Sequence, residues 1–365
     1  MKGNLMKLMH LSDLHLGKRV NEFSMIEDQK YILKEILKII DDKSPDGIII
    51  AGDVYDKPVP SAETVELFDD FLYRLSKREL KVFIISGNHD SPERLAFGNR
   101  IMDSRGIYMS PVYNGNIIPI DVDDEFGKIH IYMLPFIKPA HVRRFFPEVE
   151  ISSYTEAMKT VIENMNINKD ERNILITHQF VTGASRTESE EVSVGGSDNI
   201  DGAVFSDFDY VALGHIHTRL ASPSDKVQYS GSPVKFNTKE ASTQKGIFVV
   251  EIKEKIMPSE DLPGKLVISY DGVEYDVGFY IGDFYTEEMY QWQLQYFVVL
   301  EEEWDQLINR DFYEKQPLNK SWFAITIKNF DRTKLVGQNL RAQLQKIYGT
   351  IIELDYQFEK KQLKR

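Results

Sequence analysis

Residues 47–56 read GIIIAGDVYD, a short apolar run that ends abruptly in a glycine and two carboxylates. A run of β-branched residues entered and left through glycine is typical of a buried strand. The same pattern recurs along the first two thirds of the chain, at residues 7–15, 82–90, 174–178 and 210–217. The sequence therefore predicts five buried strands, each followed at once by polar side chains able to bind a metal.

Helical patterns separate several of these strands. Apolar residues recur at helical spacing from Ile26 to Asp42, and Ser61 opens a second helix just after Pro58 and Pro60. Strands that alternate with helices predict an α/β sheet. In such sheets the ligand site lies beyond the carboxyl ends of the strands, which is where all five polar clusters fall. Residues 227–229 and 247–250 predict further strands of the same domain.

The polar clusters contain five of the eight histidines and four oxygen donors, namely His15, His89, His178, His215, His217, Asp13, Asp53, Asn88 and Asp90. Without a cation, so many donors at one edge would leave buried charge and lone pairs uncompensated. Imidazole and oxygen ligands without thiolate suit manganese, iron or zinc rather than calcium. The supply exceeds the needs of one ion, so we expect a dinuclear site with Asp53 as the shared carboxylate. His10 lies within the first predicted strand and is expected to be a packed core residue.

Two such ions, roughly 3.5–4 Å apart, can clamp the attacking and leaving oxygens of an in-line displacement and generate a hydroxide near neutral pH. This chemistry suits the hydrolysis of phosphoesters.

Composition limits the possible functions. The chain has 365 residues and no cysteine, which excludes disulfides, thiolate zinc sites and cysteine nucleophiles. Its formal net charge is −13, so nucleic acid must be held by local basic patches, by metal or by a partner chain. Candidates for a basic rim are Lys18, Arg19, Arg94, Arg100, Arg143, Arg144 and Arg186, and residues 328–365 are locally basic. No apolar run is long enough for a secretory signal or a membrane span, so a soluble, cytoplasmic protein is expected.

Two domains are expected, residues 1–255 and residues 266–365, joined by a linker at 256–265 that contains two prolines. All three tryptophans lie in the second part. Its residues 323–327 alternate like a strand, 335–348 follow a helical pattern and 350–354 predict another strand. This βαβ-like order predicts a small α+β domain.

In their order, the polar clusters resemble the five motifs of the calcineurin-like metallophosphoesterases: Asp-Leu-His at 13–15, Gly-Asp-Val-Tyr-Asp at 52–56, Gly-Asn-His-Asp at 87–90, His178, and Gly-His-Ile-His at 214–217. Within that family the chain is similar to the SbcD-type nuclease subunits of bacterial complexes, and the supporting stretches are 13–18, 87–95, 182–185, 194–196 and 229–233. The resemblance implies a four-layer α/β fold, a β-sandwich flanked by helices, followed by a small α+β C-terminal capping domain. Residues 266–320 diverge from the family pattern.

The family pattern carries over at every motif position. It implies that Asp13, His15, Asp53 and His217 hold one ion and that Asp53, Asn88, His178 and His215 hold the other. His89 is expected to contact the scissile phosphate and to protonate the leaving oxygen rather than to bind metal. For Asp90 two interpretations stay open: it orients the His89 ring, or it is a simple turn or cap carboxylate. Asp56 is expected to contact the metal ligands without binding an ion itself.

The resemblance therefore implies a metal-dependent DNA nuclease, with exo- and endonuclease activity and two divalent cations, manganese being the expected metal. It also implies a homodimer and an SbcC-type ATPase partner in the processing of DNA double-strand breaks and hairpins, although no helices for binding that ATPase are evident before Arg365. Two alternatives remain. One is a phosphodiesterase or phosphatase of the same superfamily that acts on small molecules, and the other is a non-catalytic subunit that retains the metal centre.

Overall fold

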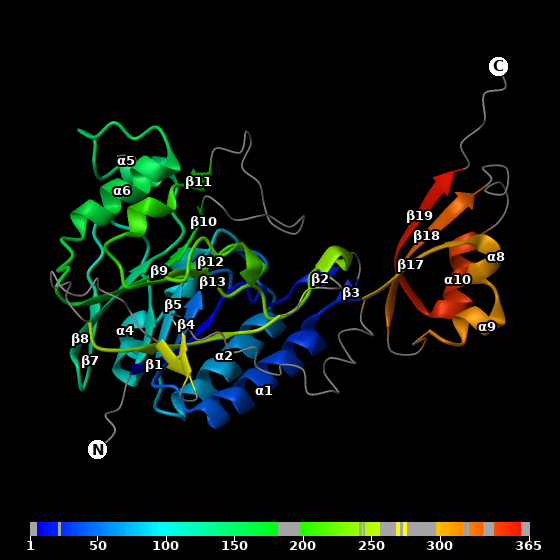
Figure 1. The fold of residues 1–365 in the computed structure, drawn as a ribbon, viewed down its shortest axis with the longest axis horizontal. Coiled ribbons are helices and arrows are strands. Elements are labelled where there is room, and N and C mark those ends of the chain that lie inside the picture. The colour runs from blue at the N-terminus through cyan, green and yellow to red at the C-terminus, as the bar shows by residue number, and fades with distance from the viewer. Residues whose placement is uncertain are drawn as a thin grey trace. The chain divides into compact units, whose positions relative to one another are not determined.

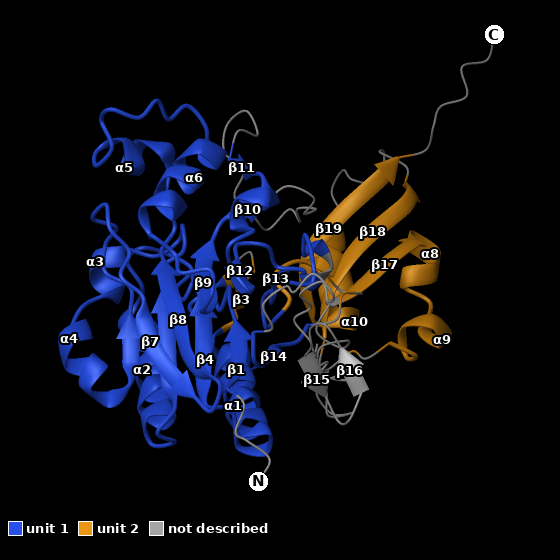
Figure 2. Cartoon of the chain, turned by 60° about the vertical axis from the view of Figure 1, so that its left-hand side comes forward, with its two compact units in different colours: residues 1–18, 26–234, 245–282 blue, residues 19–25, 235–244, 283–365 orange. Residues whose placement is uncertain are grey.

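The computed structural model describes residues 6–20, 23–181, 198–240, 243, 245–255, 268–270, 273–275, 297–316, 318, 321–330 and 339–358. The chain forms two compact units, one of residues 1–18, 26–234 and 245–282, the other of residues 19–25, 235–244 and 283–365 (Figure 2). The predicted linker at 256–265 and the stretches 182–185 and 194–196 lie outside the described residues. The predicted domain boundaries therefore stay a prediction.

The first unit contains two mixed sheets. Its strands are β1 (Met6–Leu11), β4 (Gly47–Ala51), β5 (Lys81–Ile85), β6 (Ile107–Met109), β7 (Ile120–Asp124), β8 (Gly127–Leu134), β9 (Arg172–His178), β10 (Phe180–Val181), β11 (Asn199–Ile200), β12 (Tyr210–Gly214), β13 (Val227–Tyr229), β14 (Phe248–Ile252), β15 (Ile268–Tyr270) and β16 (Val273–Tyr275). Its α-helices are α1 (Ile26–Lys43), α2 (Ala62–Ser76), α3 (Pro92–Leu95), α4 (Asn99–Met102), α5 (Pro139–Arg143) and α6 (Tyr154–Asn164). The five strands and two helices predicted ahead of the polar clusters are confirmed, and Ser61 caps α2 by accepting a hydrogen bond from the Thr64 backbone N–H at 3.3 Å.

The two sheets have the orders β14-β1-β4-β5-β6 and β13-β12-β9-β8-β7. All neighbours run parallel except β14 against β1 and β7 against β8. β4 lies at the centre of the first sheet, between β1 and β5. Its connections to these strands run through α1 and α2, which lie side by side (Figure 1). The motifs that follow the parallel strands therefore gather at the carboxyl ends of both sheets.

The sheets pack face to face around a core that alternating residues of the strands supply. Ile49 and Phe83 of the first sheet pack with Ile174 and Ala212 of the second. On its far side the second sheet buries Leu175 and other residues against α6. Both faces of each sheet are thus covered, which explains the continuous apolar runs in the sequence. The result is the predicted four-layer α/β fold.

The second unit is built on the sheet β17-β18-β19, in which all three strands run parallel. Its elements are β2 (Arg19–Val20), β3 (Phe23–Ser24), β17 (Phe297–Glu303), α8 (Trp304–Leu307), α9 (Arg310–Tyr313), β18 (Trp322–Phe330), α10 (Leu340–Tyr348) and β19 (Thr350–Phe358). The order β18-α10-β19 confirms the βαβ-like prediction, with Leu344 of α10 packed on Phe323 and Ile351. β17 is missing from the predicted elements, because its end Glu301-Glu302-Glu303 lacks the apolar alternation of a strand.

Among the described residues, no helix combines the length and the apolar character needed to cross a membrane.

Candidate metal centre

The five motifs meet where the strands β1, β4, β5, β9 and β12 end. Two backbone hydrogen bonds join the first two turns: the Asp13 N–H donates to the Gly52 carbonyl at 3.0 Å, and the His15 N–H donates to the Asp53 carbonyl at 2.9 Å. A third contact connects the second sheet to these turns: the His215 N–H donates to both oxygens of the Asp13 carboxylate at 3.1 and 3.2 Å. The carboxylate of one sheet is therefore held by the backbone of the other.

Four of the motif residues adopt a left-handed backbone: Asp13 (φ 53°), His15 (φ 41°), Asp53 (φ 49°) and His215 (φ 102°). This conformation is unfavourable for residues with a Cβ and costs on the order of 1–3 kcal/mol each. Such residues persist only where the surrounding structure holds them, and they concentrate at functional sites. The turns that carry these donors are therefore strained, and the surrounding structure holds them in the conformation that directs the side chains into the site.

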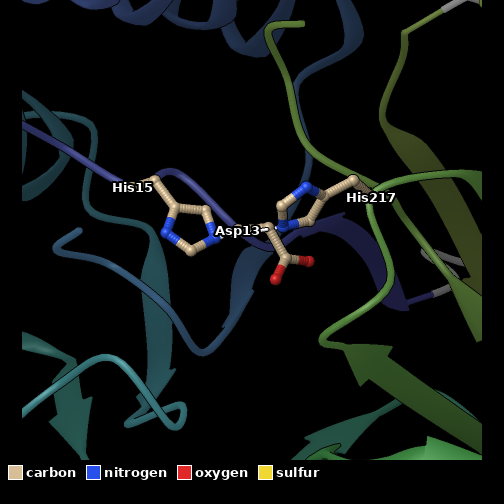
Figure 3. Close-up of side chains that lie close together, drawn as sticks. All are labelled: Asp13, His15 and His217. Atoms are coloured by element: carbon tan, nitrogen blue, oxygen red, sulfur yellow. Dashed lines mark hydrogen bonds between the residues drawn. The ribbon is translucent and has the colours of Figure 1, made fainter. Parts of the chain in front are cut away.

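The first cluster of donors consists of Asp13, His15 and His217 (Figure 3). All three are buried, and one ligand atom from each lies within 4.8 Å of the others. The two rings point toward each other beside the carboxylate, with their Nε2 atoms 3.1 Å apart. Burial lowers the pKa of both imidazoles well below the usual range, so both rings are neutral and offer lone pairs.

A second cluster overlaps the first. It consists of Asp13, Asp53 and His178, again within 4.8 Å. The Asp53 Oδ2 lies 3.5 Å from the His15 Nε2 and 3.3 Å from the His178 Nε2. Asn88 adds its Oδ1, which lies 3.0 Å from the His178 Nε2 and 3.0 Å from the His215 Nδ1. Asp53 is therefore in contact with donors of both clusters, and Asp13 belongs to both.

In the absence of a metal, the Asp53 carboxylate and the His178 ring form a buried charged pair. Burial alone would raise the pKa of Asp53, but the neighbouring His178 holds it well below the usual range, so the carboxylate stays ionised. Burial alone would lower the pKa of His178, but the charge of Asp53 raises it to about 9. The His178 Nδ1 donates to the Ala51 carbonyl at 2.8 Å, which fixes the ring with its Nε2 toward Asp53. Buried imidazole, carboxylate and amide oxygen donors of this kind fit divalent cations such as manganese.

Gly214 allows the two sheets to approach at this point. A Cβ on Gly214 would overlap the Ala51 carbonyl oxygen and lie 2.6 Å from the His178 Nδ1. A side chain here would break the hydrogen bond that orients His178.

The Asp90 carboxylate contacts the backbone of two motif turns. It accepts backbone hydrogen bonds from Val54 at 3.1 Å, Tyr55 at 2.9 Å and Gly87 at 2.9 Å. The His89 ring is held instead by its Nδ1, which donates to the Asp56 carbonyl at 3.0 Å. Asp90 thus ties two motif turns together through three backbone amides, and its role in orienting the His89 ring stays a prediction.

His89 lies against the first cluster. Its ring packs edge-on against His15 with the centroids 4.8 Å apart, and its backbone N–H donates to the Asp53 Oδ1 at 2.9 Å. A ligand atom of His89 also lies within 4.8 Å of ligand atoms of His15 and Asp53.

The residues of the predicted basic rim differ in their contacts and exposure. The Lys18 ammonium pairs with the Asp56 carboxylate at 2.9 Å, and the Arg143 guanidinium donates to the Ile151 carbonyl at 2.6 Å. Arg19, Arg94, Arg100, Arg143 and Arg144 are exposed. Arg186 lies outside the described residues.

Several buried polar residues beside the donors are absent from the predicted site. They are Ser12, Ser230, Ser232 and Lys245. The stretch 229–233 carries family resemblance but no donor type that marks a metal site, and a single lysine gives no signal in the sequence.

Known proteins resemble this chain. A family model described as calcineurin-like phosphoesterase matches residues 6–219, a range that contains all five motifs. A protein of Staphylococcus epidermidis, named as a subunit of the nuclease SbcCD, is 32% identical over 259 residues, which are 70% of this chain and 68% of that protein. A protein of the same name from Staphylococcus saprophyticus is 31% identical over 273 residues, 74% of this chain and 72% of that protein.

Proposed function

Since this chain belongs to the calcineurin-like phosphoesterase family and is a hydrolase of phosphodiester bonds, we propose that its substrate is DNA. It would act in the cytoplasm as an exo- and endonuclease on double-strand breaks and hairpins. Its similarity to two proteins named as nuclease subunits, over about 70% of its length, supports a nucleic acid rather than a small ester. The exposed Arg94, Arg100 and Arg144 supply cations for a phosphate backbone despite the net charge of −13.

The proposed ligand set has two halves that share one residue. Asp13, His15, Asp53 and His217 hold one divalent cation, and Asp53, Asn88, His178 and His215 hold the other. The position of the Asp53 Oδ2 between the His15 and His178 rings is the observation that carries this assignment. With manganese as the proposed metal, the two cations would activate water for attack and neutralise charge on the phosphate.

His89 is proposed as the general acid. Because the Asp56 carbonyl can only accept, the Nδ1 of His89 carries a proton and the Nε2 is the nitrogen that exchanges one with substrate. An imidazolium in this orientation would donate its Nε2 proton to the leaving oxygen. Asp90 has no direct part in this step; it holds the turns at Val54 and Gly87 that carry Asp53 and Asn88.

The proposal includes two partners. One is an SbcC-type ATPase, supported by the name of the similar proteins, which makes them one component of the SbcCD nuclease. The other is a second copy of this chain. Light scattering that gives the mass of one chain at working concentration would contradict the homodimer.

The test compares wild type with His89→Ala in the presence of manganese. The substrates are labelled linear duplex, labelled single-stranded DNA and a nitrophenyl phosphodiester, and elemental analysis counts the bound ions. Wild type is expected to cleave DNA and to hold two ions per chain, whereas His89→Ala is expected to keep both ions and lose hydrolysis.

Three results would contradict parts of this proposal. Cleavage of the small ester but of neither DNA would favour a small-molecule phosphodiesterase. Loss of an ion from His89→Ala would show that His89 is a ligand. Two bound ions without hydrolysis of any substrate would favour a non-catalytic role.

A further inference from the structure

A buried polar cluster lies beside the metal centre, outside the five motifs. Ser12, Ser230, Ser232 and Lys245 are all at most 3% exposed, although lysine is among the residue types least often buried. Ser230 and Ser232 follow β13 at the edge of the second sheet, and Lys245 precedes β14 at the edge of the first. The cluster therefore lies where the chain passes between the two sheets.

One half of the cluster holds the backbone of His217. The Lys245 ammonium donates to the His217 carbonyl at 2.9 Å and to the Ser232 hydroxyl at 2.8 Å. The Ser232 N–H donates to the same carbonyl at 3.2 Å. The bond from Lys245 is charge-assisted and buried, which makes it stronger than a neutral one.

Gly231 makes this close approach possible. It adopts φ 75°, and a Cβ there would lie 2.9 Å from the His217 carbonyl oxygen. The turn can therefore reach His217 only without a side chain at this position.

The other half holds the side chain of Asp13. The Ser12 hydroxyl donates to the Asp13 Oδ2, and its oxygen lies 2.7 Å from the Ser230 hydroxyl. Since Ser12 has one proton and a carboxylate only accepts, Ser230 donates to Ser12. A chain of two hydroxyls thus connects Asp13 to the same turn that holds His217.

We propose that Ser12, Ser230, Ser232 and Lys245 form a positioning clamp that fixes Asp13 and His217 relative to each other. These two residues come from different sheets, after β1 and after β12, so their spacing is not set by either sheet alone. The clamp joins them through one turn. It rests on the proposed function in one respect, namely that Asp13 and His217 bind the same ion.

In metal sites of other proteins, loss of a hydrogen bond that positions a ligand residue typically lowers metal affinity roughly ten- to a hundredfold. Lys245→Met keeps the apolar stem and removes the ammonium. It is expected to weaken the ion at Asp13, His15, Asp53 and His217 by about this factor, while the ion at Asn88, His178 and His215 keeps an affinity near wild type. Ser232→Ala removes one bond of the same clamp and is expected to weaken the same ion to a smaller extent.

Lys255→Met is the matched control. The Lys255 ammonium donates to the Glu171 carbonyl at 2.8 Å and to the Asp209 carboxylate at 3.0 Å. Both partners precede strands of the second sheet, at the ends opposite the metal centre. This variant removes a comparable lysine contact and is expected to leave both manganese affinities unchanged.

The experiment is a manganese titration of the metal-free full-length proteins by calorimetry, with thermal unfolding recorded for each. Selective weakening of one ion in Lys245→Met and Ser232→Ala, but not in Lys255→Met, would support the clamp. The clamp is overturned if Lys245→Met and Ser232→Ala both bind the two ions with wild-type affinity. It is also overturned if all three variants, Lys255→Met included, bind both ions equally more weakly. If Lys245→Met does not fold, Ser232→Ala alone decides. Wild type that binds fewer than two manganese ions would overturn the proposed function instead.

Discussion

His10→Gln is expected to make the first unit less sensitive to acid. His10 is fully buried in β1, and its Nδ1 lies 2.9 Å from the Tyr210 hydroxyl in the facing sheet. Its ring stacks on Phe248 with the centroids 6.1 Å apart. Burial lowers the pKa of His10 to about 3, and the Leu213 carbonyl opposes this only in part. His10 is therefore neutral in the folded protein over the whole working range of pH.

The sign and size of the effect follow from linkage. The pKa of His10 is taken as its ordinary value of 6.5 in the unfolded chain and is about 3 in the folded protein. Between these values the unfolded chain binds one more proton than the folded chain, so the free energy of unfolding falls as the pH falls. The slope approaches about 1.4 kcal/mol per pH unit, and the loss between pH 8 and pH 5 is about 2 kcal/mol.

The assay is urea unfolding at pH 8 and pH 5, followed by far-ultraviolet circular dichroism. Tryptophan fluorescence is unsuitable, because Trp292, Trp304 and Trp322 all belong to the second unit. Since the pKa values of the buried His15 and His217 are also lowered, the measured quantity is the difference between wild type and His10→Gln at equal metal content.

Tyr210→Phe is the control for the lost hydrogen bond. It removes the hydroxyl that faces His10 but keeps the titrating ring, so its loss of stability between pH 8 and pH 5 should match wild type. The reasoning is refuted if His10→Gln and wild type lose the same free energy of unfolding between these two pH values.

Three further variants test the site and the core. Asp53→Ala is expected to lose both ions together, and one retained ion per chain in elemental analysis would refute the shared carboxylate. Arg172→Met should lower the free energy of unfolding by roughly 3–5 kcal/mol, because it leaves Asp124, whose side chain is 4% exposed, as an unpaired buried charge; a loss below about 1 kcal/mol in urea titrations would argue against this. Gly214→Ala should cost on the order of 1–3 kcal/mol and weaken manganese binding, because its Cβ displaces the carbonyl that orients a ligand ring. In Gly202→Ala the added Cβ meets its nearest neighbour at an ordinary 3.5 Å, so equal effects of the two glycine variants would contradict the steric explanation.

Much of the fold is readable from local patterns. Residues 47–51 form a strand that is buried on both faces, and their continuous apolar run predicts such a strand. Ser61 starts α2 because its side chain caps the first turn, a local interaction that sequence spacing reveals. β17 is the counterexample: it pairs with β18 over seven positions, Phe297 to Glu303, yet its acidic end has no strand pattern, because the parallel neighbour and not the residue types decides its conformation.

The side chains of the candidate site divide in the same way. The donor types and their positions after predicted strands are local properties, so histidines and carboxylates such as His178 and Asp53 can be identified from the sequence. The hydrogen-bond partners of Asp90 cannot be identified from the sequence, because they are three backbone amides from two different turns.

By itself, the amino-acid sequence determined the strands and helices that lead to the five motifs, the absence of cysteine and the residue types that could bind metal. Only the tertiary structure decided which donors meet. His15 and His217 are 202 residues apart in the chain, and their ring nitrogens lie 3.1 Å apart. The Lys245 contact with His217 likewise joins segments that no periodic pattern connects. Contacts of this kind depend on how two sheets pack against each other, and packing is a property of the whole chain rather than of any one stretch of it.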